Sequence, residues 1–462
     1  MNQFLTHSGL YTDFYELTMA QGYFRAGKAN KQASFDYFFR KLPFGGGYVI
    51  HAGLSDLLAY LTEMKFTSDD LHYLKNQRFQ EDFLDYLEQF CFTGNVHAMR
   101  EGEVVFPNEP VLRVDAPIIE AQIIETVVLN ILNFESLIAT KASRIRSACG
   151  KRSFMDFGLR RAHGWGGLQA SKAAMIGGAD STSNVLCGKL YEVPVAGTQA
   201  HSWIESYDSE LEAFHAFASL YPDLCILVVD TYDTLRSGIP NAIQVAKAME
   251  EKGFHMAGIR LDSGDFVTLS KKVREMLDKA GLGYVRIVAS NQLDEYEIER
   301  LLSQNAPVDS FGVGTSLVTG DPDGALDGVY KMSSFDDQPR IKISESADKI
   351  LLPGKKQVFR SVDITGCFME DLIVLEDEVT AQNDSAGKET LLSPVVTKGS
   401  VCFAEYKLTE ISAYCMERLS KLPDKLKKLT VSGSYPVRLS KKLETLKKSM
   451  VNTILQNIHE KD

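Results

Sequence analysis

The chain has little of what a disulfide-stapled or zinc-binding protein needs. Seven cysteines are scattered through 462 residues, their number is odd, and no C-x-x-C pair occurs. The nine histidines show neither zinc-finger nor H-E-x-x-H spacing. Cys367, Cys402 and Cys415 are too dispersed to suggest a zinc cluster. We therefore predict free thiols in a reducing cytoplasm and no metal held by protein ligands alone.

An excess of positive charge is also missing. Lys and Arg number 50 against 61 Asp and Glu, which gives a formal net charge of -11. A chain with this charge has no overall basic field to attract a polyanion, so we expect no nucleic-acid partner. Any phosphate-binding site must be local.

No segment has the pattern of a secretory leader or a membrane anchor. Residues 1–20 carry polar and acidic groups throughout, without a basic start or an apolar core. No later run approaches the roughly 20 apolar residues that a spanning helix needs. We expect a soluble, cytoplasmic protein without a membrane partner.

The chain does contain enough apolar sequence for a large core. Hydrophobic residues make up 44% of it and charged residues 24%, and at roughly 100–200 residues per domain the length predicts two or three domains. Residues 15–25 have helical spacing and residues 33–40 alternate like a strand. Residues 117–149 form a long helical stretch with a break expected near Asn133. The first part of the chain therefore predicts an α+β domain.

From residue 153 to about 334, short β-branched runs alternate with helix-length segments, which is typical of parallel strands joined by crossover helices. The predicted strands are 193–196, 225–230, 255–261, 284–290 and 308–312. Polar signatures, several of them containing glycine, follow these runs. An open doubly wound sheet would gather its ligand groups at one switch point, so the pattern favours an α/β fold with an irregular parallel β/α barrel.

After residue 335 the chain reverts to alternating strands, as at residues 357–360, and we expect these to rejoin the first domain. The predicted domains are an N-terminal α+β domain at residues 1–112, the β/α barrel at residues 113–335, and a C-terminal segment at residues 336–462. That segment partly completes the N-terminal domain and ends in a helical tail.

One run carries the most chemical information. Residues 193–202, Val-Pro-Val-Ala-Gly-Thr-Gln-Ala-His-Ser, stop at Gly197 and present His201 where a helix is expected to begin. Strand ends collect functional groups in a β/α barrel. An imidazole is a nucleophile near neutral pH, although a histidine at such a place is more often a hydrogen-bonded structural residue. The run alone leaves both interpretations open.

Five motifs in the same order favour the functional interpretation. They are Tyr11-Thr-Asp-Phe-Tyr-Glu-Leu-Thr-Met-Ala, Asp156-Phe-Gly-Leu-Arg-Arg, Gly197-Thr-Gln-Ala-His-Ser, Arg260-Leu-Asp-Ser-Gly-Asp and Gly312-Val-Gly-Thr. Together they resemble nicotinate phosphoribosyltransferase, a family with an N-terminal α/β domain and the irregular barrel of type II phosphoribosyltransferases. The resemblance implies that nicotinate and 5-phosphoribosyl 1-pyrophosphate give nicotinate mononucleotide and pyrophosphate, the first step of NAD salvage. It also implies coupling to ATP hydrolysis, Mg²⁺, and a homodimer with shared active sites.

The resemblance further implies roles for single residues. His201 would be phosphorylated by ATP. Arg260 and Thr198 would bind nicotinate, and Tyr15 would pack on it from the neighbouring subunit. From residue type alone, Arg260 suits a flat ring or a carboxylate but equally an ordinary ion pair. Tyr15, at helical spacing, is equally a core residue.

The resemblance also implies which residues contact phosphate and metal. The residues implied to line the substrate site are Phe157, Arg160, Arg161, Ser263, Gly264, Asn291, Gly312, Gly314 and Thr315. Asp262 would hold either the ribose hydroxyls or Mg²⁺, and the sequence leaves that choice open. Asp230 would orient His201 or else cap the helix that follows, and both remain open. The sequence also leaves open which basic residues, such as Arg40, come from the partner subunit.

Three kinds of alternative compete with this function: a related phosphoribosyltransferase, a binding protein and an unrelated barrel enzyme. Nicotinamide and quinolinate phosphoribosyltransferases share related barrels, but the first lacks these motif forms and the second is typically much shorter. A binding protein that had lost turnover would show a damaged His201 or phosphate loop, and both are intact. A barrel lyase or aldolase would need a Schiff-base lysine or a metal cluster at a strand end, and neither is found there.

Overall fold

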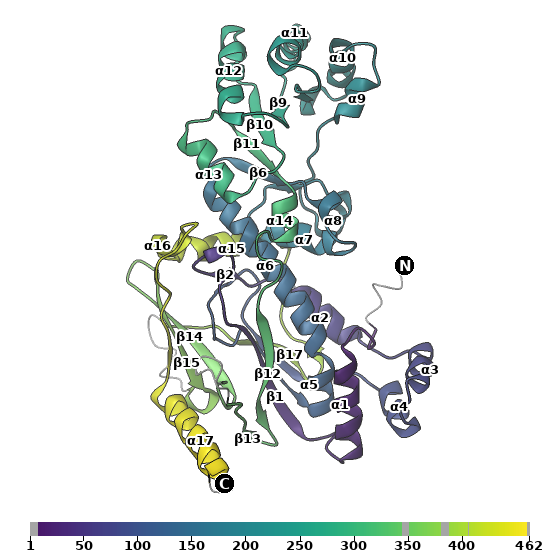
Figure 1. The fold of residues 1–462 in the computed structure, drawn as a ribbon, viewed down its shortest axis with the longest axis vertical. Coiled ribbons are helices and arrows are strands. Elements are labelled where there is room, and N and C mark those ends of the chain that lie inside the picture. Colours follow the sequence, from purple (N-terminus) through teal and green to yellow (C-terminus); the bar gives the residue numbers. More distant parts are fainter. Residues whose placement is uncertain (1–7, 344–350, 380–387, 405, 460–462) are drawn as a thin grey trace. The chain divides into compact units, whose positions relative to one another are not determined.

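The computed structural model describes residues 8–343, 351–379, 388–404 and 406–459 (Figure 1). The chain forms two compact units, and each is described by itself. Unit 1 consists of residues 1–137, 325–406 and 413–462, and unit 2 of residues 138–324 and 407–412.

The boundaries between these units differ from the domain boundaries expected at 112/113 and 335/336. The reason lies in two strands. Both β5 (Leu112–Pro117) and β12 (Gly328–Phe335) pair antiparallel with β1 (Gln32–Phe39). Two segments that the sequence assigned to the barrel therefore belong to the sheet of unit 1.

Unit 1 is built on a seven-stranded sheet of order β13-β12-β1-β5-β3-β17-β18. Its central strand β1 buries Phe35, Tyr37 and Phe39, the residues that alternate in the sequence. Strand β17 pairs antiparallel with β3, so the C-terminal part of the chain completes the N-terminal domain. The remaining strands of this sheet are β3 (Asn95–Ala98), β13 (Gln338–Pro339), β17 (Ser393–Thr397) and β18 (Ser400–Val401).

Two smaller sheets complete unit 1, and a buried ionic network joins them. Arg360 donates to Glu103 (Nη1–Oε1 2.7 Å) and Asp371 (Nη2–Oδ2 2.6 Å), and Arg418 also donates to Glu103 (Nε–Oε1 2.8 Å). Removing one partner of such a pair strands a buried charge and costs about 3–5 kcal/mol. The sheets comprise β16 (Lys388–Thr390), β14 (Lys356–Val362), β15 (Phe368–Leu375) and β19 (Val437–Leu439), and β2 (Val49–Ile50) with β4 (Val104–Val105).

Helices surround these sheets. The first, α1 (Phe14–Arg25), matches the helix expected at residues 15–25 and lies beside α5 (Ile118–Ile123) in Figure 1. Thr12 fastens its start, donating to the carbonyl of Ile123 at 3.0 Å. The others are α2 (Leu54–Glu63), α3 (Ser68–Asn76), α4 (Glu81–Glu88), α16 (Asp424–Lys427) and α17 (Lys441–His459). Helices α6 (Glu125–Cys149) and α15 (Leu408–Lys421) each have residues in both units.

The long helical stretch breaks at Ile124, between α5 and α6, and not near Asn133 as expected. The Asn133 side chain instead accepts a hydrogen bond from the Tyr37 hydroxyl at 2.9 Å and leaves the helix intact. By length and composition the span Ile118–Cys149 would suffice to cross a membrane, which the sequence analysis did not expect. Because 72% of its most apolar window is buried inside the protein, it fits the core helix of a globular protein.

Unit 2 contains a six-stranded parallel sheet of order β7-β6-β11-β10-β9-β8. The pairing of β6 with β11 brings the first and last strands together, so the strands follow one another in sequence order around a ring. The ring is open between β7 and β8, which makes the barrel irregular. Its strands are β6 (Ser153–Asp156), β7 (Ser181–Thr182), β8 (Ile226–Val228), β9 (Gly258–Leu261), β10 (Arg286–Ser290) and β11 (Ser310–Val313).

The strand expected at residues 193–196 is the main difference from the predicted barrel. Only one parallel bridge forms there, between Thr182 and Val195. Val195 is 54% exposed, so this β-branched run does not pack as a barrel strand. The His201 motif consequently lies in the chain between β7 and β8, the two strands that leave the ring open.

Helices follow each strand of the barrel, as expected for a parallel sheet. In Figure 1 the helices α10 to α13 lie around strands β9 and β10. The helices of unit 2 are α7 (Gly166–Ile176), α8 (Val185–Tyr191), α9 (His201–Glu205), α10 (Glu210–Leu220), α11 (Ile239–Glu250), α12 (Phe266–Lys279), α13 (Glu295–Ser303) and α14 (Thr315–Thr319).

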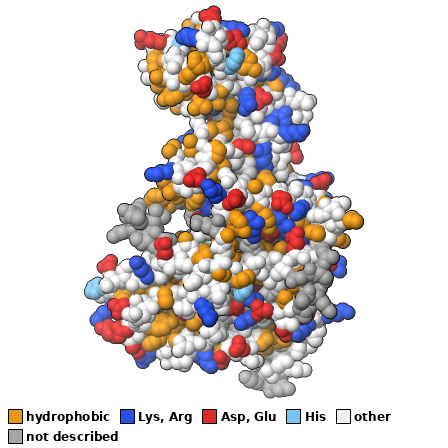
Figure 2. Space-filling view, turned by 180° about the vertical axis from the view of Figure 1, so that it is seen from behind, with side chains coloured by type: hydrophobic (Ala, Val, Ile, Leu, Met, Phe, Trp, Pro, Cys, Tyr) orange, Lys and Arg blue, Asp and Glu red, His pale blue; other side chains and the backbone are white. Residues whose placement is uncertain are grey.

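The surface mixes charges of both signs. Figure 2 shows Lys and Arg side chains interspersed with Asp and Glu over the face in view. This mixing fits the net charge of -11 and leaves phosphate recognition to individual side chains.

Candidate active site

His201 is the first residue of α9 and follows the extended residue Ala200. Its Nδ1 lies 3.1 Å from the Thr231 hydroxyl, and its Nε2 lies 3.8 Å from Oδ2 of Asp262. The side chain is 39% exposed. One nitrogen is therefore held by a neutral hydroxyl, and the other faces a carboxylate and remains within reach of a ligand.

Asp230 does neither of the things expected of it. Its Oδ2 accepts hydrogen bonds from the Asp262 backbone N–H (2.9 Å) and the Ser263 hydroxyl (2.6 Å), and no hydrogen bond joins it to His201. The helical turn that follows is capped by Asp233. Asp230 thus holds the turn after β9, and the adjacent Thr231 is the residue beside the imidazole.

Asp262 stands at the centre of the site. The Ser290 hydroxyl at the end of β10 donates to its Oδ1, and the Asn291 amide donates to its backbone carbonyl at 2.9 Å. Asn291 adopts a left-handed conformation (φ 84°), an uncommon state for a residue other than glycine. The ends of β8, β9 and β10 are therefore joined by hydrogen bonds around one carboxylate.

Arg260 lies on β9 beside this carboxylate. Its Nη1 donates to the Thr198 hydroxyl at 2.5 Å, and its Nε lies 3.9 Å from Asp262 Oδ1. Burial lowers the pKa of Arg260, against the opposite effect of Asp262. The Nε–H is buried without a hydrogen-bond partner among the described residues. A buried donor of this kind is suited to an acceptor supplied by a ligand.

Packing against Phe157 explains why residues 312 and 314 are glycines. A Cβ on Gly312 would lie 2.5 Å from the Phe157 ring, and one on Gly314 would lie 3.2 Å from its carbonyl oxygen. Phe157 is itself buried and its N–H donates to the carbonyl of Val313 at 2.8 Å. The Gly-x-Gly sequence therefore has a packing role here, alongside the phosphate contact that the sequence predicts.

Several other predicted residues do not join the hydrogen bonds of this cluster. Arg160 and Arg161 are exposed on a short 3₁₀ turn, Leu159–Arg161, and the charge of Arg160 reaches Arg260. Thr315 starts the short helix α14, and Gly264 is exposed with φ 86°. Tyr15 lies in unit 1, on α1, and is 47% exposed.

Sequence reasoning missed three residues of the site. Thr231 and Ser290 follow or end predicted strands and differ from the chosen residues by one position. Gln199, inside the His201 motif, is 5% exposed, and neither its amide oxygen nor its nitrogen has a hydrogen-bond partner among the described residues. The signal for each was its place at a strand end or in the motif, but the choice among neighbouring polar residues requires geometry.

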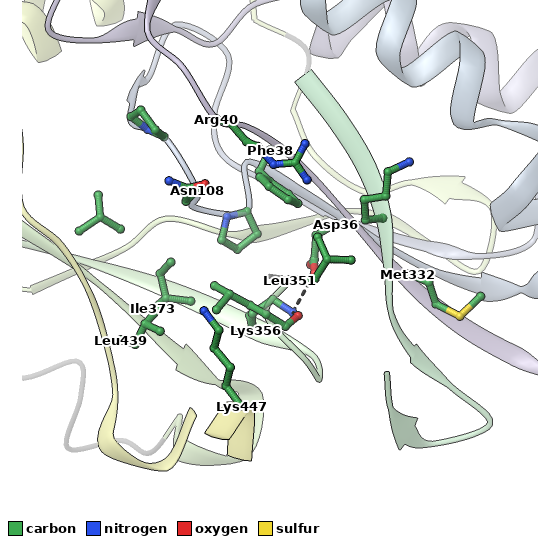
Figure 3. Close-up of a pocket in the computed structure, with 15 residues that line it drawn as sticks. Asp36, Phe38, Arg40, Asn108, Met332, Leu351, Lys356, Ile373, Leu439 and Lys447 are labelled. Atoms are coloured by element: carbon green, nitrogen blue, oxygen red, sulfur yellow. Dashed lines mark hydrogen bonds and ion pairs between the residues drawn. The ribbon is translucent and has the colours of Figure 1, made fainter. Parts of the chain in front are cut away.

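Cavities occur in both units. Beside the candidate site, a cavity of about 640 Å³ is lined by residues of the turns after β9 and β10, including Ser263, Gly264 and Asn291. A smaller cavity of about 260 Å³ lies in unit 1, where Figure 3 shows Lys356 paired with Asp36 below Arg40. Of the residues considered from sequence, only Arg40 lines this second cavity. The candidate site therefore lies in the barrel.

The fold and the site define a class. A parallel β/α barrel that gathers a histidine, carboxylates and an arginine at the ends of its strands carries its chemistry there, as barrel enzymes do. Comparison with known proteins makes this an enzyme of the phosphoribosyltransferase type.

Three family models cover most of the chain. The nicotinate phosphoribosyltransferase (NAPRTase) N-terminal domain matches residues 10–133, the nicotinate phosphoribosyltransferase (NAPRTase) family matches residues 152–351, and the nicotinate phosphoribosyltransferase C-terminal domain matches residues 383–447.

Individual relatives agree. The chain is 41% identical to the nicotinate phosphoribosyltransferase of Bacillus subtilis (strain 168), over 98% of this chain and 96% of that protein. It is 33% identical to the Homo sapiens nicotinate phosphoribosyltransferase, over 96% of each. The crystal structure of human nicotinic acid phosphoribosyltransferase superimposes with a TM-score of 0.86 at 32% identity, covering 95% of this chain and 99% of that one. The chain therefore belongs to the nicotinate phosphoribosyltransferase family and has that family's function in NAD salvage.

Proposed function

We propose that this enzyme couples nicotinate phosphoribosyl transfer to ATP hydrolysis through a phosphoryl group carried by His201. The observation that supports the proposal best is the different surroundings of the two imidazole nitrogens. With the proton on Nδ1 donating to Thr231, Nε2 keeps its lone pair and lies 3.8 Å from Oδ2 of Asp262, on a side chain that is 39% exposed. A nucleophile whose second nitrogen is held in this way is pre-organised to attack a phosphoryl group.

Asp262 is suited to serve as one ligand of Mg²⁺. Among the described residues, no three His, Cys, Asp or Glu side chains lie close enough to bind a metal by themselves. Mg²⁺ in phosphate-transferring sites takes one or two carboxylates and completes its shell with phosphate oxygens and water. Asp262 offers such a carboxylate, and Oδ1 of the neighbouring Asp230 is buried without a hydrogen-bond partner among the described residues. When bound, the ion would neutralise charge on the departing pyrophosphate.

Arg260 and Thr198 support nicotinate as the acceptor. The guanidinium is fixed by the Thr198 hydroxyl, and its buried Nε–H has no hydrogen-bond acceptor among the described residues. A carboxylate satisfies a buried guanidinium by a charge-assisted hydrogen bond, whereas the amide of nicotinamide brings no compensating charge. This difference favours the acid over the amide.

A homodimer with shared active sites is part of the same proposal. Four apolar side chains on or just before the first turns of α1 are exposed: Tyr11 (49%), Phe14 (59%), Tyr15 (47%) and Met19 (38%). A row of exposed aromatic residues on one helix is typical of a surface that packs against another chain. A second copy covering this face would bring Tyr15 to the partner's nicotinate.

The test is an assay with two substrates and two variants. Purified protein receives 5-phosphoribosyl 1-pyrophosphate, Mg²⁺ and ATP with either nicotinate or nicotinamide, and mononucleotide and ADP are quantified by chromatography. We expect nicotinate mononucleotide with ADP release, loss of the ADP release in His201→Ala, and unchanged turnover in the matched control His215→Ala on α10. Product from nicotinamide alone would contradict the substrate assignment, and ADP release that persists in His201→Ala would contradict the coupling.

A further inference from the structure

A buried carboxylate that has no part in the site described above holds the turn that carries Arg160 and Arg161. Asp156 is the last residue of β6 and is 0% exposed. Its Oδ1 accepts a hydrogen bond from the Gly158 N–H at 2.8 Å, and the short 3₁₀ turn of the two arginines begins just after Gly158. The Arg161 N–H donates to the Gly158 carbonyl at 2.7 Å. The backbone of the turn is therefore tied to Asp156 at its start.

The same carboxylate also connects the turn to α7 and β7. Oδ2 of Asp156 accepts hydrogen bonds from the hydroxyls of Ser171 on α7 and Thr182 on β7, both at 2.7 Å. Asn184 occupies the acceptor side of both hydroxyls, since its side-chain amide donates to Ser171 at 3.2 Å and its backbone N–H donates to Thr182 at 3.0 Å. Three donors therefore converge on Asp156, and a carboxylate satisfies all of them because both of its oxygens accept.

The turn also packs against the loop from which the sequence predicts a phosphate contact. A Cβ on Gly158 would lie 1.9 Å from Cγ1 of Val318, so the turn lies directly against α14, the helix that begins at Thr315. The Phe157 N–H donates to the Val313 carbonyl at 2.8 Å. All of these residues belong to unit 2. The two segments with predicted phosphate contacts are therefore packed together where the paired strands β6 and β11 end.

We propose that Asp156 is a positioning residue for 5-phosphoribosyl 1-pyrophosphate, because it holds the turn in the place from which Arg160 and Arg161 reach the pyrophosphate. Both arginine side chains are exposed, so the backbone of the turn decides where their guanidinium groups can act. Misplacing a substrate-binding group by about 1 Å can cost on the order of a hundredfold in rate. The inference rests on the proposed function, since it takes the two arginines as ligands of the pyrophosphate. Asp156 acts through the turn and does not itself touch substrate.

A positioning role and a purely stabilising role give different kinetics. A residue that only stabilised the fold would, when changed, reduce the amount of folded enzyme, which lowers the apparent kcat and leaves both KM values unchanged. A displaced turn instead weakens the binding of one substrate. Nicotinate is expected on Arg260 and Thr198, which lie in other segments of unit 2, so its KM should not respond. A selective rise in the KM for 5-phosphoribosyl 1-pyrophosphate therefore identifies positioning.

The experiment measures both KM values and kcat in the full-length enzyme. Asp156→Asn keeps the shape and removes one acceptor, so one of the three donors loses its partner, and we expect the KM for 5-phosphoribosyl 1-pyrophosphate to rise by roughly tenfold. The KM for nicotinate should stay at the wild-type value. Asp309→Asn is the matched control: Asp309 accepts the Ile287 N–H at 2.8 Å just before β11, at the opposite end of the barrel strands, and both KM values should be unchanged. Equal rises in the two KM values of Asp156→Asn, or a lower kcat with unchanged KM values, would overturn the inference.

A second variant keeps the test decisive if Asp156→Asn does not fold. Thr182→Val removes one donor to the carboxylate and leaves its contact with Gly158, so the KM for 5-phosphoribosyl 1-pyrophosphate should rise selectively by roughly fivefold. An unchanged KM in this variant would count against the inference.

A double variant, Arg160→Ala with Arg161→Ala, separates the inference from the proposal on which it rests. If the double variant leaves the KM for 5-phosphoribosyl 1-pyrophosphate unchanged, the arginines do not bind the pyrophosphate, and their proposed role fails together with that of Asp156. If it raises this KM while Asp156→Asn and Thr182→Val do not, the arginines keep their role and only the positioning by Asp156 is wrong.

Discussion

Thr231 holds one nitrogen of His201 at 3.1 Å and leaves the other within 3.8 Å of Asp262. A neutral hydroxyl holds the ring without adding a second negative charge near the phosphoryl group that the imidazole is proposed to accept. Asp230, one residue earlier, fixes instead the backbone on which Asp262 stands. At this scale the site depends on which of two adjacent residues points toward the imidazole.

We predict that Thr231→Val lowers the rate of ATP-dependent turnover by about fivefold, because a hydrogen bond of this kind contributes about 1 kcal/mol. Thr231→Ser retains the hydroxyl and should retain most of the rate. Steady-state ADP release at saturating nicotinate measures the effect. Equal rates in the valine and serine variants would show that the hydroxyl does not orient the ring.

The sequence identified the segments that form the site, but it did not identify which side chains in those segments contact one another. His201, Asp262, Arg260 and Thr198 do lie together, because strand ends in a parallel barrel meet at one edge. Thr231 could not be distinguished from its neighbours in this way. At a turn that follows a strand, the direction of each side chain depends on local backbone angles that no periodicity encodes.

Among the elements, the connection between β2 and α2 contains an unusual buried group. His51 is 1% exposed, and neither ring nitrogen has a hydrogen-bond partner among the described residues. Burial lowers the pKa of His51 to about 4, against the opposing effect of Glu101. The side chain is therefore neutral in the folded protein at pH 7 and acts as a packing group.

The lowered pKa of His51 makes the stability of the folded protein depend on pH. Between pH 6.5 and pH 4 the unfolded chain takes up a proton at His51 that the folded chain does not, so the free energy of unfolding falls as pH falls. From pH 7 to pH 5 the share of His51 is about 2 kcal/mol. We expect His51→Leu to lose less stability over this range in denaturant titrations, while His72→Gln at an exposed position of α3 loses as much as the wild type. Parallel losses in all three proteins would contradict this assignment.

The elements that the sequence predicted best are those with a clear period. Strand β1 and helix α1 match because alternation and helical spacing mark buried faces directly. The strand expected at residues 193–196 forms only one bridge, because β-branched residues favour extended backbone whether or not a neighbouring strand is available. The break at Ile124 falls within a sequence of helical spacing and carries no proline or glycine to mark it.

For the whole molecule, the proposed dimer leads to a prediction that concerns both subunits together. If Tyr15 of one subunit completes the partner's site, a variant lacking Tyr15 and a variant lacking His201 damage different halves of each site. Mixed dimers of Tyr15→Ala and His201→Ala would then contain one intact site.

We expect the two variants to show little activity separately and about a quarter of the wild-type activity after unfolding and refolding together, since half of the dimers are mixed and each has one intact site. The measurement is nicotinate mononucleotide formation at limiting nicotinate. Activity of the mixture equal to the average of the separate variants would contradict shared sites.

The most direct test of the central proposal is detection of the phosphoryl group on His201. The enzyme is incubated with Mg²⁺ and ATP labelled in the γ-phosphoryl group, without nicotinate, and intact and digested protein are analysed by mass spectrometry under alkaline conditions that preserve phosphohistidine. We predict one acid-labile phosphoryl group per chain, located on the peptide containing His201 and discharged when nicotinate and 5-phosphoribosyl 1-pyrophosphate are added. A labelled group on another residue, or ADP release without any labelled protein, would contradict the account.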